Sequence, residues 1–179
     1  MADHGHVHDA ACAAAHGEVV PPADTRRLVL VFASPVADEM AVLAARLCWP
    51  TALVDPDPSR LGSSPDRAMT SLAAAQLTDT DDVVLCDHGR AELGDLLADV
   101  LRGPFRWVGV MGSLRHTAPH VAALRQRGCS EGDIARVHRP IGLDIGSHTP
   151  AEIALATIAG LLADRNGRSG GRFPVQRST

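Results

Sequence analysis

The sequence predicts a three-layer α/β domain built on a mostly parallel sheet, and three observations lead to this prediction. Short, continuous apolar runs alternate with helical patterns along the chain, which is typical of parallel sheets with helical crossovers. The runs lack polar alternation, as expected of strands covered on both faces. With 179 residues, of which 45% are hydrophobic, the chain is long enough to bury one core of ordinary size.

The elements follow in order along the chain. The predicted strands are 28–33, 51–54, 82–86 and 107–111. The predicted helices are 36–47, about 91–101, one that carries Val121 and Leu124, and one that begins at 150. The segment 55–65 is a loop rich in Pro, Ser and Gly, and the pattern over 68–77 does not distinguish a helix from a strand.

The predicted domain spans residues 26–170, between a flexible His-rich arm at 1–25 and a tail at 171–179. The arm contains His4, His6 and His8, with Cys12 and His16 nearby, and these are ligand types for zinc, copper or nickel. Nothing in the arm fixes them in one geometry, so we predict no metal site there.

Composition excludes several classes of partner. The net charge of −4 and an aromatic content of 3% argue against nucleic-acid binding. No apolar run is long enough for a membrane span, and the first residues lack the apolar core of a signal peptide. The four cysteines are scattered without a C-x-x-C pair, which indicates reduced thiols and a cytoplasmic protein.

The most informative segment is 140–152, Pro-Ile-Gly-Leu-Asp-Ile-Gly-Ser-His-Thr-Pro-Ala-Glu. Thr149 suits an N-cap, Pro150 suits the first helical position, and Glu152 completes a capping box. The amino terminus of a helix offers free N–H groups and a partial positive charge, which suit a phosphate or carboxylate. A tight, well-capped turn without a ligand explains the same residues, and this alternative stays open.

A second block, Trp107 to His116, is a strand that passes through Gly112-Ser113 into a helix. Glycine at 112 lets the backbone approach a ligand, and Ser113 can cap the helix or bind a phosphate oxygen. Together, the two blocks resemble the carboxyl-terminal Rossmann-like domain of the XdhC/CoxI family, over about residues 27–171. The resemblance implies a role in maturing molybdenum hydroxylases such as xanthine dehydrogenase and carbon monoxide dehydrogenase.

The chain departs from the family after its first strand. Family members usually have Gly-Ala-Gly-His-Val-Ala there, and this chain has Phe-Ala-Ser-Pro-Val-Ala at 32–37. Both glycines that would admit a pyrophosphate are missing, and Pro35 removes one N–H donor. Asp55 remains at the end of the second strand, where an acidic residue commonly binds a ribose hydroxyl. We therefore expect that the turn does not support ordinary NAD(P) binding.

Polar residues follow several of the predicted strands, and the carboxyl ends of parallel strands meet at one edge of the sheet. Asp87 and His88 could act as a base or bind metal, although capping of the next turn is the favoured interpretation. Arg115 is placed for contact with an anion. The candidate cofactor-binding residues are Ser34, Asp55, Asp87, His88, Gly112, Ser113, Arg115, Gly142, Asp144 and Gly146.

The function expected from the resemblance is a non-catalytic maturation factor. It would hold molybdenum cofactor (molybdopterin), or a dinucleotide form of it, for a molybdenum hydroxylase apoenzyme. A separate protein with the XdhC amino-terminal domain is a further expected partner, and a homodimer is the expected assembly. An NAD(P)-dependent oxidoreductase and a ligand-free Rossmann scaffold are the alternatives.

Overall fold

Six parallel strands form one sheet in the computed structural model, which describes residues 13–14, 16–17, 24–62, 68–112 and 119–171. The strand order is β3-β2-β1-β4-β5-β6. The strands are β1 (Leu28–Val31), β2 (Thr51–Val54), β3 (Ala68–Met69), β4 (Asp82–Leu85), β5 (Trp107–Val110) and β6 (Val137–His138). After β3 the chain crosses to the other side of β1 and adds β4, β5 and β6 there, which is the Rossmann order, and the predicted fold class is confirmed.

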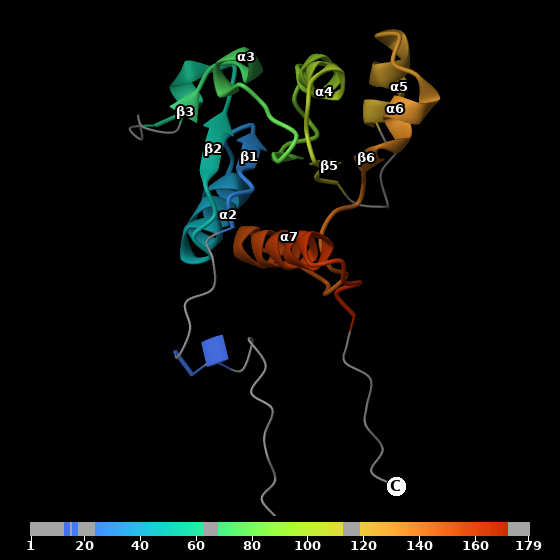
Figure 1. Cartoon of the computed structure of the whole chain (residues 1–179). Coiled ribbons are helices and arrows are strands. Elements are labelled where there is room, and N and C mark those ends of the chain that lie inside the picture. Colours follow the sequence, from blue (N-terminus) through green and yellow to red (C-terminus); the bar gives the residue numbers. More distant parts are fainter. Residues whose placement is uncertain (1–12, 15, 18–23, 63–67, 113–118, 172–179) are drawn as a thin grey trace, which may run out of the picture.

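Helices cover both faces of the sheet (Figure 1). One face carries α2 (Pro35–Arg46) and α7 (Pro150–Arg165), which pack against each other. The opposite face carries α3 (Leu72–Ala75), α4 (Leu93–Arg102), α5 (Pro119–Gln126) and α6 (Glu131–Ala135). A short 3₁₀ turn, η1 (Pro58–Arg60), follows β2. The predicted three layers are therefore present.

Local sequence explains how the two helices of the first face begin. The Ser34 side chain caps α2 by accepting a hydrogen bond from the N–H of Ala37 at 3.2 Å. Thr149 and Glu152 form the predicted capping box of α7, with Pro150 in the first turn. Both helices start at the carboxyl edge of the sheet. The helix α2 follows the end of β1, and α7 ends at the amino edge, where its last residue, Arg165, contacts Asp82, the first residue of β4.

The segment 68–77, for which the sequence favours no single element, contains β3 and α3. The elements α6 and β6 are absent from the sequence-based prediction. A strand of two residues is too short to show a periodic pattern, and β6 is fixed by its pairing with β5. Within the described part of the chain, no helix is long and apolar enough to cross a membrane.

Candidate functional site

Asp55, the candidate ribose acceptor, is fully buried and already hydrogen-bonded at both oxygens. Arg90 donates to both of them at 3.1 Å, and the N–H groups of Ala33 and Asp57 each donate at 2.9 Å. Burial alone would raise the pKa of Asp55, but the hydrogen bonds from Arg90 and the two N–H groups outweigh it and lower the pKa. A ribose hydroxyl would have to displace these donors.

Phe32 stands where the family has its first glycine, and it keeps the left-handed backbone that glycine usually adopts, with φ +73°. The backbone at this one position therefore keeps the left-handed conformation although the glycine is missing. The Phe32 side chain is completely buried, and the Arg90 guanidinium lies 4.7 Å from the centre of its ring. Glu92 binds the same guanidinium at 3.0 Å. An ion-paired arginine thus crosses the point where the strand order reverses.

Three further candidates at this edge have local explanations or lie open to solvent. Ser34 is occupied as the N-cap of α2. Asp87 accepts a hydrogen bond from the N–H of Gly89 at 2.8 Å, as expected if it caps the turn. His88 is exposed. Among the described residues, no three His, Cys, Asp or Glu side chains are grouped to hold a metal ion.

Gly112, at the end of β5, lies directly against the guanidinium of Arg139. A Cβ atom at Gly112 would come within 2.5 Å of Arg139 Nε, so any side chain here would push the arginine out of its position. His120 is buried close by, and burial together with the charge of Arg139 lowers its pKa. Ser113 and Arg115, the predicted partners of Gly112, lie outside the described residues. The structure adds Arg139 as a cation at this end of the sheet.

Gly142 packs on the middle of α7. It has φ +88°, and a Cβ atom there would lie 2.9 Å from the backbone of Ala156 and Thr157. The next residue, Leu143, donates its N–H to the carbonyl of Ala156 at 3.0 Å. Gly142 therefore serves close packing of the loop on the helix.

The two other candidates in the loop are more open. Asp144 is exposed, and Gly146 has φ +70° with no atom within 4 Å of the position that a Cβ atom would take. Their roles in binding stay predictions.

The chain itself supplies acceptors for several N–H groups at the start of α7. The Glu152 carboxylate accepts hydrogen bonds from the N–H groups of His148 at 2.7 Å and Thr149 at 3.0 Å. These bonds lower the pKa of Glu152 and place a negative charge at the helix terminus. An external anion would compete with this carboxylate, so the capped-turn alternative gains support at α7.

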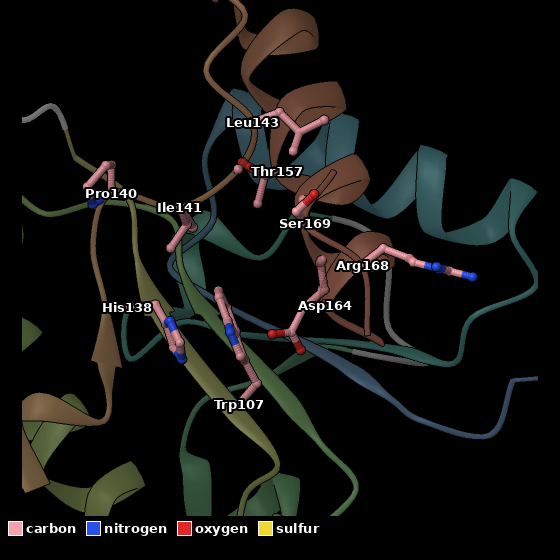
Figure 2. Close-up of a pocket in the computed structure, with 12 residues that line it drawn as sticks. Trp107, His138, Pro140, Ile141, Leu143, Thr157, Asp164, Arg168 and Ser169 are labelled. Carbon is pink, nitrogen blue, oxygen red and sulfur yellow. The ribbon is translucent and has the colours of Figure 1, made fainter. Parts of the chain in front are cut away.

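A pocket of about 240 Å³ lies between the β5–β6 side of the sheet, the loop after β6 and α7 (Figure 2). Trp107 and His138 line it from the strands, and their rings stack at 4.9 Å with an interplanar angle of 15°. Asp164, near the end of α7, and Ser169 line the opposite side. The sequence alone does not indicate this pocket, because its walls are far apart along the chain.

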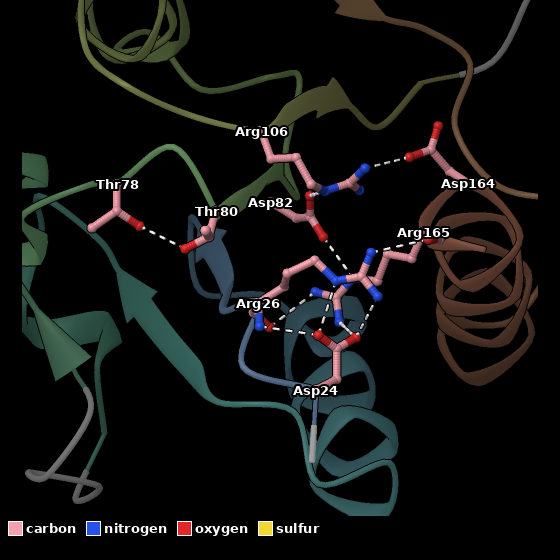
Figure 3. Close-up of polar contacts among 8 residues, drawn as sticks. All are labelled: Asp24, Arg26, Thr78, Thr80, Asp82, Arg106, Asp164 and Arg165. Carbon is pink, nitrogen blue, oxygen red and sulfur yellow. Dashed lines mark hydrogen bonds and ion pairs between the residues drawn. The ribbon is translucent and has the colours of Figure 1, made fainter. Parts of the chain in front are cut away.

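Asp164 also belongs to an ion-pair network at the amino edge of the sheet (Figure 3). The fully buried Asp82 side chain binds Arg106 and Arg165, and Arg165 also binds Asp24 at 2.9 Å. Asp24 falls within the arm predicted at 1–25, yet it is held by the folded domain.

Comparisons with known proteins show what this chain resembles. A family model described as the XdhC Rossmann domain matches residues 28–161. The uncharacterized protein YqeB of Escherichia coli strain K12 is 32% identical over 154 residues, covering 81% of this chain and 28% of YqeB. A crystal structure described as a xanthine dehydrogenase from Bacillus halodurans superposes with a TM-score of 0.65 at 21% identity. The match covers 84% of this chain and 45% of that one, so the chain spans less than half of both proteins.

Proposed function

Because this chain belongs to the XdhC Rossmann domain family, we propose that it acts in the maturation of a molybdenum hydroxylase of the xanthine or carbon monoxide dehydrogenase type. The family match over residues 28–161 is the observation that carries the proposal. The description of the Bacillus halodurans protein as a xanthine dehydrogenase points to the same class of enzyme. The role is that of a cytoplasmic, non-catalytic carrier of molybdenum cofactor or of its dinucleotide form.

The proposed contact for an anionic group lies after β5, at the carboxyl edge of the sheet. At the ends of β1 and β2, Asp55 and Arg90 form an ion pair, so a pyrophosphate there would compete with Asp55 for Arg90. After β5, Gly112 has no side chain, and the Arg139 guanidinium takes the space beside its backbone. A cofactor phosphate would gain a charge-assisted contact from Arg139 there. When bound, the cofactor would bring the molybdenum that the client enzyme uses.

The amino-acid residues of this chain would only bind and present that cofactor. Ser113 and Arg115 are the further residues that we propose for phosphate binding, and Asp144 would accept a hydrogen bond from a polar edge of the ligand. The apoenzyme is the proposed recipient.

A homodimer is the proposed assembly, and the outward side of α7 supports it. Leu155 and Leu162 lie two helical turns apart on this side, and they are 52% and 38% exposed. Burying this surface between two copies would remove exposed apolar area from water. Light scattering should show a dimer that Leu155→Glu converts to monomer, and a monomeric wild type would refute this assembly.

The maturation role can be tested by expressing a molybdenum hydroxylase with and without this chain in a host that makes molybdenum cofactor. We expect a higher molybdenum content and activity per enzyme when the chain is present. Arg139→Ala should lower this gain, and Arg136→Ala is the matched control because Arg136 is exposed and stacks on Phe105. An enzyme that is equally loaded in all cases would contradict the role and favour the ligand-free scaffold.

A further inference from the structure

The pocket beside Trp107 presents one open aromatic face. Gly109, two residues further along β5, has no side chain, and the edge of the Trp107 indole fills the space that a side chain there would take. His138 is paired with Gly109 in the sheet register and stacks on one side of this indole. Figure 2 shows the other side of the indole turned toward Asp164. A flat ring entering the pocket would extend the stack of His138 and Trp107 by one more ring.

A carboxylate stands at the edge of this aromatic face. Asp164 accepts one hydrogen bond through Oδ1 from Arg106 at 2.7 Å. Within the described part of the chain, no group donates a hydrogen bond to its second oxygen, Oδ2. A carboxylate accepts hydrogen bonds and cannot donate them, so it selects ligand edges that carry N–H donors.

The remaining walls limit the size of the ligand. Ile141 and Leu143 provide apolar contact from the loop, and Thr157 and Leu161 provide the wall of α7. The volume of about 240 Å³ is below the range of typical drug-sized sites and suits a bicyclic ring system without large substituents.

We propose that this pocket binds a flat nitrogen heterocycle with adjacent N–H donors, which is the 2-amino-4-oxopyrimidine edge shared by guanine and pterin. The ring stacks on the free face of Trp107, and the amino and ring N–H groups donate to Asp164. The site is separate from the contact between Gly112 and Arg139. This inference deepens the proposed function and rests on it in one respect: molybdenum cofactor contains a pterin.

The test follows the two tryptophan indole N–H signals of the ¹⁵N-labelled full chain by NMR during titration with 6-hydroxymethylpterin or guanosine. Trp107→Phe assigns the signals. The Trp107 signal should shift in a saturable way, while that of Trp49, buried against Arg165, should stay in place. The tighter of the two ligands identifies the source of the ring. Adenosine, which lacks the paired donors, should bind at least about ten times more weakly.

Two variants and one control decide the outcome. Asp164→Asn should weaken binding by about tenfold or more. Ser169→Phe, at an exposed position that lines the pocket, should block it and leave Asp164 in place. Asp99→Asn is the control, because Asp99 is likewise exposed and paired with an arginine but lies on α4.

Absence of a saturable shift at millimolar pterin and guanosine would overturn the inference, as would unchanged binding by both pocket variants. Neither result depends on whether the chain raises the molybdenum content of a client enzyme, so the two proposals fail separately.

Discussion

Replacing Asp24 with asparagine should destabilise the domain, although Asp24 lies in the segment that the sequence assigns to the arm. Arg26 donates to both oxygens of Asp24 at 2.9–3.0 Å, and Arg165 adds a further contact at 2.9 Å. Burial opposes ionisation, but these hydrogen bonds and charges lower the pKa of Asp24 from 3.8 to about 2. A difference of nearly two pKa units corresponds to about 2 kcal/mol of stability at neutral pH.

For a domain of this size, a loss of about 2 kcal/mol should lower the melting temperature by roughly 4–8 °C. Because the pKa is lower in the folded state, this stabilisation is present above pH 3.8 and is lost as the pH falls through about 2. Denaturant unfolding of the wild type and of Asp24→Asn at several pH values measures both effects.

Deletion of residues 1–23, which keeps Asp24, is the control and should leave the melting temperature nearly unchanged. Equal stability of Asp24→Asn and the wild type at pH 7 would refute the assignment of Asp24 to the folded domain. A difference that stays constant from pH 7 to pH 2 would show that the charge is not its cause.

Three more predictions concern the loops at the carboxyl edge and the loop beside α7. Calorimetry should show no micromolar binding of NAD(H) or NADP(H), because Arg90 already occupies Asp55; micromolar affinity would refute this. Gly142→Ala should cost several kcal/mol because its Cβ would collide with α7, whereas Gly146→Ala, with open space around it, should cost only about 1 kcal/mol; thermal unfolding compares them. Asp144→Asn should weaken cofactor binding without changing the melting temperature, and the reverse result would make Asp144 structural.

Features that depend on neighbouring residues can be predicted from the sequence. The start of α7 is predicted to the residue, because Thr149 and Glu152 satisfy each other within one turn. The strands β1, β4 and β5 can be predicted because a continuous apolar run is the pattern of a strand that is buried on both faces.

Contacts between distant parts of the chain cannot be predicted in the same way. Arg90 meets Asp55 across 35 residues, and nothing in the local sequence of either residue indicates the pair. The contact of Arg139 with Gly112 and the pocket at Trp107 likewise need the assembled sheet. The left-handed backbone of Phe32 is also not indicated by its residue type, because the surrounding core holds it in that conformation.

The arrangement of Phe32, Arg90 and Asp55 has a consequence for how this edge could change. Arg90→Ala would leave a buried carboxylate with less compensation, and Phe32→Gly would leave a cavity beneath the guanidinium. Each step toward an open nucleotide turn is therefore destabilising when taken alone. A double-mutant cycle on Phe32 and Arg90 should show non-additive free energies. Such epistasis would make the closed turn hard to reverse by single substitutions. A lineage that acquired this turn would therefore not readily regain dinucleotide binding.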